Sequence, residues 1–306
     1  MATAERFSIF TASLTYGSAQ TLNLVQLESF SVKPQENKSS LIPGGLVDRA
    51  AVLVSHGTPQ IGFTIRDLAT LFGQVSLATG LATTGTSTFR MQERSDGSTF
   101  ETGATHETWT TTGGFVIVDS LTANQDDANG AMATCTFVAL WNGTTDPLVH
   151  NTGVNFSGVA APAFGSQFFL GPVYHNSAAL TGITSVTVNP GLSYEAKAFS
   201  GDPYPRRGVI VRREPTLSFT AAKIDTAGAL DMFGGNITNS IYFYFQRGVD
   251  AGERVAAASS VHCSVGCTSA HWSPDEVSVS GNDDGTVTVT IMPKVAISVS
   301  VASTIP

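Results

Sequence analysis

Two cysteines and two histidines lie close together near the C-terminal end of the 306-residue chain, and their side chains could bind a metal ion. His262 and Cys263 are followed by Cys267 and His271, and Cys and His are the ligands that zinc prefers. If residues 260–269 form a strand, Cys263 and Cys267 lie on one face and His262 on the other. Because the donors then diverge, the pattern favours buried free thiols, which are common core residues, over a zinc site.

Paired aspartates at two places could bind calcium. The tripeptides are Gln-Asp-Asp at 125–127 and Asn-Asp-Asp at 282–284. Neither has the spaced ligands and the distant bidentate glutamate of an EF-hand. Both occur where a tight hairpin turn is expected, and Asp and Asn favour turns for their own hydrogen-bonding reasons. We therefore expect turns without a bound ion.

The motifs of common enzyme classes are missing from the sequence. The chain has no Gly-x-Ser-x-Gly nucleophile motif and no Gly-x-x-x-x-Gly-Lys phosphate loop, and its six histidines are scattered. We therefore expect no catalytic residues, no cofactor and no enzymatic activity.

Two further clusters each admit two interpretations. The aromatic run at 241–245 could stack on sugars or bases, or it could be a strand that is buried on both faces or between subunits. The arginines at 206–207 and 212–213 could contact phosphate, or they could form ion pairs with the acidic remainder of a neighbouring subunit.

Composition indicates a folded β protein. Hydrophobic residues make up 42% of the chain and charged residues only 13%, which excludes a disordered protein. Enrichment in Thr, Ser, Val and Gly favours strands and turns over long helices. The net charge of −8 argues against a sequence-reading nucleic-acid binder. Three cysteines are too few for a disulfide framework, so we expect them to be reduced.

The start of the sequence resembles no secretory signal, and no apolar run reaches the roughly 20 residues of a membrane helix. We therefore expect a soluble protein that is made in the cytoplasm and does not enter a membrane.

The chain contains two diverged copies of one unit. Similar segments follow one another in the same order at separations of 156 to 162 residues, as in the pairs Leu24 and Val186, Phe63 and Phe219, and Phe72 and Phe233. Each copy has one short helical pattern after a Pro-x-apolar-x-Phe strand, at 67–75 in the first copy and at 226–234 in the second. In the first, an apolar stripe at i, i+3, i+4 and i+7 predicts a helix packed on a sheet: Leu68, Leu71, Phe72 and Val75.

The later parts of the two copies also correspond. Strand-like segments at 87–94 and 240–247 are followed by the turn dipeptides Asn129-Gly130 and Asp284-Gly285, each of which leads into an alternating strand. The sequence thus predicts a mainly β fold with two tandem β-sandwich or small-barrel domains, each with one short helix. We place the domains at 1–150 and 168–306, with a linker at 151–167.

The order of these elements resembles the tail tube (major tail) proteins of long-tailed bacteriophages. The best local match is the segment Arg-Glu-Pro-Thr-Leu-Ser-Phe-Thr-Ala at 213–221, followed by the helical pattern at 226–234. The resemblance extends in weaker form over 7–145 and 168–295.

This resemblance implies a structural virion protein whose sheets join with those of neighbouring units into stacked rings for DNA passage. Such rings usually have six-fold symmetry, so a duplicated chain implies a pseudo-hexameric homotrimer. The implied partners are other copies of the chain, tape-measure, terminator and baseplate proteins, and DNA that passes without specific binding. The implied location is the virion tail, assembled in the host cytoplasm. Pro- and Gly-rich loops at 35–48 and 200–208 are the candidate assembly loops, with these candidate residues: Pro43, Gly44, Gly45, Asp48, Asp202, Pro203, Tyr204, Pro205, Arg206 and Arg207.

Other functions remain open from the sequence. A carbohydrate-binding or adhesive module would use exposed aromatic side chains, for which the candidates are Trp109, Trp141, Trp272, Tyr242 and Tyr244. A capsid decoration protein or another ring component of a virion is a further alternative, such as a tail terminator or hub.

Overall fold

A computed structural model describes residues 6–34, 36–41, 51–94, 106–127, 130–155, 167–222, 235–237, 240–249, 253–278 and 285–306. Among the described residues, strands account for 64% and helix for only 2%, which confirms the predicted mainly β fold. In the described part of the chain, no helix is both long and apolar enough to span a membrane.

The first half contains eleven described strands and one helix. They are β1 (Arg6–Tyr16), β2 (Gln20–Lys33), β3 (Glu36–Leu41), β4 (Ala51–His56), β5 (Gln60–Ile65), α1 (Leu68–Phe72), β6 (Leu81–Thr83), β7 (Ser87–Arg94), β8 (His106–Thr111), β9 (Gly114–Asn124), β10 (Met132–Ala139) and β11 (Val149–Val154).

The second half contains twelve described strands. They are β12 (Phe168–His175), β13 (Ala178–Leu180), β14 (Ile183–Asn189), β15 (Leu192–Lys197), β16 (Arg207–Arg213), β17 (Thr216–Ala221), β18 (Gly235–Ile237), β19 (Ile241–Arg247), β20 (His262–Cys267), β21 (Ala270–Ser278), β22 (Thr286–Pro293) and β23 (Ser298–Ser303).

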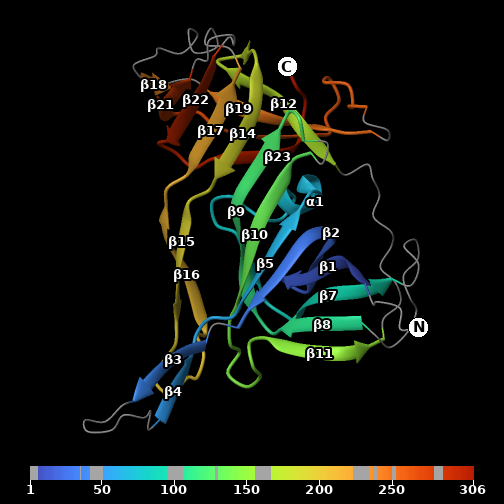
Figure 1. The fold of residues 1–306 in the computed structure, drawn as a ribbon, viewed down its shortest axis with the longest axis vertical. Helices are drawn as coiled ribbons and strands as arrows, with labels where there is room; N and C mark the ends of the chain where they lie inside the picture. The colour runs from blue at the N-terminus through green and yellow to red at the C-terminus, as the bar shows by residue number, and fades with distance from the viewer. Residues whose placement is uncertain are drawn as a thin grey trace.

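One large antiparallel sheet runs through both halves (Figure 1). Its strand order is β11-β8-β7-β1-β2-β5-β10-β9-β14-β17-β22-β21-β18, with β6 paired to β1 and β9. The halves join where β9 pairs with β14. A second sheet contains β13-β12-β19-β20-β23, and two-stranded ribbons are formed by β3 with β4 and by β15 with β16.

The two halves have the same strand pairings. In the first half β2 pairs with β5 and the β3–β4 ribbon lies between them in sequence; in the second half β14 pairs with β17 and the β15–β16 ribbon lies between them. β5 then pairs with β10 and β10 with β9, as β17 pairs with β22 and β22 with β21. The pairing of β7 with β8 is repeated by β19 with β20.

These shared pairings fix which residues are equivalent. Following the paired residues from strand to strand in each half shows which residues occupy the same place in the two units. Equivalent residues are 154 to 156 positions apart in the sequence: Phe30 and Val186, Phe63 and Phe219, Cys135 and Val289, Val116 and Trp272, and Phe89 and Phe243.

The predicted match of Leu24 with Val186 is therefore wrong. Leu24 pairs with β1 and is equivalent to Leu180, which pairs with β12. The physical reason is that the single long strand β2 corresponds to two strands, β13 and β14, in the second half.

The same aromatic contact occurs in both halves, between β5 and β7 in the first and between β17 and β19 in the second. The ring centroids of Phe63 and Phe89 lie 6.0 Å apart, and those of Phe219 and Phe243 lie 6.3 Å apart. All four side chains are buried in a single hydrophobic cluster that extends through both halves. Burial of large aromatic side chains is the main stabilising term expected for layers of this kind.

Helix α1 begins where the sequence predicts. The Asp67 side chain accepts a hydrogen bond from the Thr70 backbone N–H at 3.1 Å, which caps the first turn. The predicted stripe is confirmed, because Leu68, Leu71, Phe72 and Val75 are all buried. Its predicted counterpart at 226–234 lies outside the described residues, as does Phe233. The predicted linker begins within β11, which ends at Val154, and residues 156–166 lie outside the described ranges.

Candidate assembly interface

The junction of β9 with β14 is an edge-to-edge contact between the two repeated units. Leu121 pairs with Val188, Thr122 with Thr187, and further pairs follow at Ala123 with Val186 and Asn124 with Ser185. Antiparallel pairing of this kind satisfies the backbone groups that a strand edge would otherwise present to solvent. The contact is head to tail, because β9 of one unit meets the strand equivalent to β2 of the other.

The β15–β16 ribbon of the second unit covers β9 and β10 of the first (Figure 1). Phe115, Ile117 and Val138 form a small apolar cluster on which Tyr194 packs. The rings of Phe115 and Tyr194 meet edge to face at 5.3 Å, and Gln60 Nε2 donates a hydrogen bond to the Tyr194 hydroxyl. The ribbon therefore adds a side-chain contact between the units to the strand pairing.

Asp119 lies beside this covered surface in a β-bulge of β9. Its carboxylate accepts a hydrogen bond from Thr136 Oγ1 at 2.7 Å. Burial raises the Asp119 pKa, against smaller lowering effects of the Thr136 hydrogen bond and the Lys33 charge. Burial, followed by the negative charge of Asp119, raises the pKa of Tyr194. The ribbon thus brings Tyr194 near this carboxylate.

Gly208 in β16 permits the close approach of ribbon and sheet. A Cβ on Gly208 would lie 2.1 Å from Cε1 of Phe115, well inside van der Waals contact. Glycine is therefore required for Phe115 to keep this position.

The candidate assembly loop at 202–207 lies at the end of this ribbon and contacts the first unit. Trp141 donates its backbone N–H to the Pro205 carbonyl at 2.8 Å, and the Arg206 guanidinium lies 4.6 Å from the centroid of a Trp141 ring. Arg206 Nε also pairs with Asp202 at 3.0 Å, and the Tyr204 ring lies 6.5 Å from that of Trp141.

Two other candidates in this loop make no contact of this kind in the described structure. Pro203 and Arg207 are exposed, although Arg207 helps to line a hollow of about 590 Å³ between the ribbon and the first unit. The candidates Pro43, Gly44, Gly45 and Asp48 lie outside the described residues.

Parts of two strand edges that correspond to the internal junction have no partner among the described residues. The outer edge of β2 is paired with β1 only as far as Leu27. The edge of β21 that pairs with β18 at 270–272 is unpaired from Ser273 to Ser278. These edges are the repeats of β14 and β9, the two strands that join the units within the chain.

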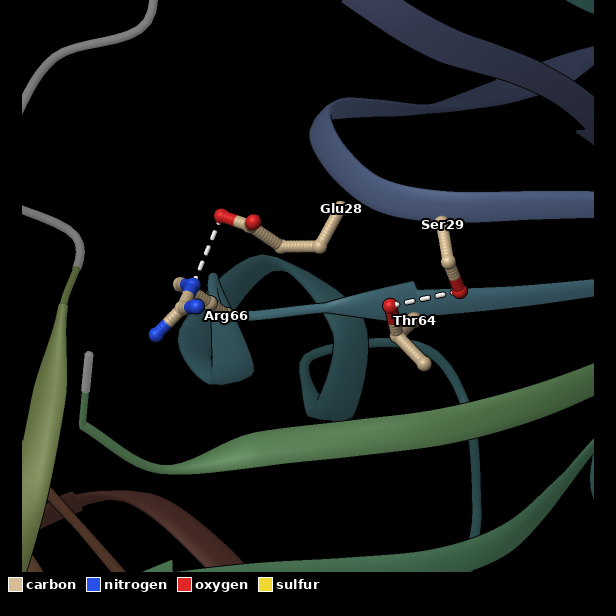
Figure 2. A network of polar contacts seen from close by, with 4 residues as sticks. All are labelled: Glu28, Ser29, Thr64 and Arg66. Carbon is tan, nitrogen blue, oxygen red and sulfur yellow. Dashed lines mark hydrogen bonds and ion pairs between the residues drawn. The ribbon is translucent and has the colours of Figure 1, made fainter. Parts of the chain in front are cut away.

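Beyond Leu27, β2 is paired with β5 on one edge and is free on the other. Polar side-chain contacts reinforce its pairing with β5 (Figure 2). Arg66 Nε pairs with Glu28 Oε1 at 2.6 Å, and the hydroxyls of Ser29 and Thr64 lie 2.9 Å apart. The β2 edge is thus held against β5 next to the start of α1, just after a β-bulge between Leu27 and Ser29.

The candidate metal donors, which the sequence favoured as buried free thiols and separate histidines, do not form a cluster in the described structure. Cys263 and Cys267 are buried free thiols, and burial raises the Cys263 pKa to about 12. His262 is also buried, where Nδ1 accepts a hydrogen bond from the Arg247 N–H at 3.1 Å, and His271 is exposed on β21. Among the described residues no group of three or more metal donors occurs.

The remaining candidates from the sequence, the paired aspartates and the second arginine pair, have ordinary structural roles where they are described. Asp126 and Asp127 follow β9 in a turn, and 282–284 lies outside the described residues. Arg212 pairs with Glu214 of the same chain.

The aromatic candidates for sugar binding are largely covered. Trp272 and Tyr244 are buried, Trp109 stacks on His150 at 4.8 Å, and Trp141 lies beneath Arg206. The run at 241–245 is strand β19, which is paired on both edges by β12 and β20. Side-chain burial weighs against an open stacking platform on this strand, since every residue of the run is buried except Tyr242, which is half-buried.

Comparison with known proteins adds no relative: neither the family models nor the curated proteins contain a match to the chain.

Proposed function

We propose that this chain is a structural virion protein that assembles into stacked rings of a bacteriophage tail tube, with three chains in each ring. The observation that carries the proposal is the β9–β14 junction, where two repeated units already join head to tail within one chain. A heterologous contact that repeats with rotation produces a ring when the rotation closes.

The same junction has a counterpart between chains. Equivalent residues of these strands are 156 positions apart. Val32 and Ser31 of β2 therefore correspond to Val188 and Thr187 of β14. In the same way, Val277 and Ser278 of β21 correspond to Leu121 and Thr122 of β9. Pairing β2 of one chain with β21 of the next would repeat the internal contact and would pair the free parts of these two edges. The six-fold character of the ring, and hence three chains of two units, is taken from the resemblance to tail tube proteins.

The charge of the chain suits a passage for DNA. A net charge of −8 gives no general attraction to phosphate, so DNA would slide without binding. In this proposal the protein resides in the virion tail and contacts tape-measure, terminator and baseplate proteins.

Electron microscopy of the purified chain at high concentration, with tail assembly partners added, tests this function. We expect rings or tubes whose end-on views have three-fold symmetry with a six-lobed outline. Dispersed monomers under these conditions would rule the function out.

A further inference from the structure

We propose that the β3–β4 ribbon of one chain docks on the outer face of β21 and β22 of a second copy, around Met292, where Lys38 meets Asp275. This inference rests on the proposed self-assembly and names the surface and the segment that would form it. It follows from the internal repeat: the β15–β16 ribbon covers the equivalent face of the first unit.

The face on β22 lacks the cover that its repeat has. Val138 on β10 is fully buried beneath the β15–β16 ribbon, whereas its equivalent on β22, Met292, is 42% exposed. Register shows the equivalence, because Phe115 pairs with Val138 as His271 pairs with Met292. Equivalent positions are thus covered in the first unit and open in the second, which is the arrangement expected if the cover of the second unit comes from another chain.

The β3–β4 ribbon has the geometry to be the missing cover. Lys38 pairs with Val54 as Tyr194 pairs with Ile210, so Lys38 is equivalent to Tyr194. Figure 1 shows this ribbon extending from the first unit beyond the strands that carry it. The β3–β4 ribbon follows β2 in the chain, as the β15–β16 ribbon follows β14. A neighbouring chain that pairs with the edge of β2 would therefore also be the chain that the β3–β4 ribbon contacts.

Charge complements this docking. Asp275 lies in a β-bulge of β21 and accepts a hydrogen bond from Thr290, as Asp119 does in β9 from Thr136. In the first unit the residue brought near the aspartate is Tyr194; between chains it would be Lys38. A lysine opposite an aspartate adds attraction and fixes the register of the contact.

The sizes of the contacting residues differ between the two interfaces in a complementary way. Gly208 of the docked ribbon lies against the large ring of Phe115. The equivalent residues are Val52 in β4 and His271 in β21, since Ser40 pairs with Val52 as Ala196 pairs with Gly208. A larger ribbon residue thus accompanies a smaller residue on the face that it would cover.

Charge exchange tests the pairing. We would measure association by sedimentation velocity over a concentration series for Lys38→Glu, Asp275→Lys and the double variant. Each single change is expected to weaken association by about tenfold or more, and the double variant to return to within about threefold of the original chain. The exposed aspartate Asp146, outside both surfaces, provides the matched control Asp146→Lys, which is expected to change nothing.

Further arms separate the possible failures. Asp275→Asn removes the charge but keeps an oxygen that can accept the Thr290 hydrogen bond. It provides a second test if Asp275→Lys lowers the melting temperature, and it too is expected to weaken association. If the original chain associates and the single variants do so equally well, or if the double variant is not restored, this docking is wrong while ring assembly stands. If the original chain stays monomeric even with tail assembly partners, the proposed function fails and the docking fails with it.

Discussion

Cys263 lies in the hydrophobic core on strand β20, and this burial decides its chemistry. The thiol is completely buried, and burial raises its pKa to about 12 from the ordinary value of 9.0. A protonated thiol is a poor nucleophile and a poor metal ligand. Burial likewise raises the pKa of Cys135, followed in effect by the charge of Asp119. The cysteines therefore act as small core residues.

The raised Cys263 pKa makes stability depend on pH. The unfolded chain loses the thiol proton near pH 9 and the folded chain only near pH 12, so the folded state is favoured below pH 9 and loses this advantage as pH rises. One such thiol lowers the free energy of unfolding by about 1.4 kcal/mol per pH unit within that window. Urea unfolding from pH 8.5 to 11 should therefore show a shallower decline for Cys263→Ala than for the original chain, whatever the variant's starting stability. Equal slopes would mean that the thiol ionises equally in both states.

At the scale of elements, the β15–β16 ribbon shows what sequence reasoning could and could not find. The strands of both units were predictable, because alternation and the Pro-x-apolar-x-Phe segment fix Phe63 and Phe219 at equivalent positions. The contact of Trp141 with the loop at 202–207 was not, since it joins residues about 60 positions apart that share no local pattern. The assignment of Leu24 failed for a related reason: one long strand in the first unit is two strands in the second, and only hydrogen-bond register reveals this.

The close packing of the ribbon predicts a coupled pair of substitutions. Gly208→Ala places a Cβ against the Phe115 ring and should destabilise the fold by about 1–3 kcal/mol. In a Phe115→Ala background the ring is gone, so the same change should cost much less, and the double variant should be more stable than the sum of the single effects. Chemical denaturation of the four proteins measures this coupling.

A matched glycine provides the control for that cycle. A Cβ at Gly113 would meet only the Thr83 carbonyl oxygen at 4.0 Å, so Gly113→Ala should be well tolerated in either background. Additive effects of Gly208→Ala and Phe115→Ala would show that the ribbon does not press on this ring in solution.

At the scale of the whole molecule, the chain is two units joined by a contact that each unit could make again. β9 and β14 use one pair of complementary edges, and β2 and β21 keep the other pair unpaired among the described residues. The sequence alone suggested the duplication, but which edges are joined depends on the sheet order. A head-to-tail contact repeated between chains leads either to a closed ring or to an open filament, and the two differ in how many chains can be linked.

Covalent trapping of the β2–β21 contact measures that number directly. Ser31 and Ser278 are the counterparts of Thr187 and Thr122, which pair directly across the internal junction, so cysteines at both positions of one chain would face each other across neighbouring chains. The native cysteines are buried, and the single variants Ser31→Cys and Ser278→Cys serve as controls that lack the partner thiol. After oxidation and denaturing electrophoresis, the proposed ring predicts a ladder that ends at three chains for the double variant only. Monomers alone, or a ladder that continues past three, would contradict it.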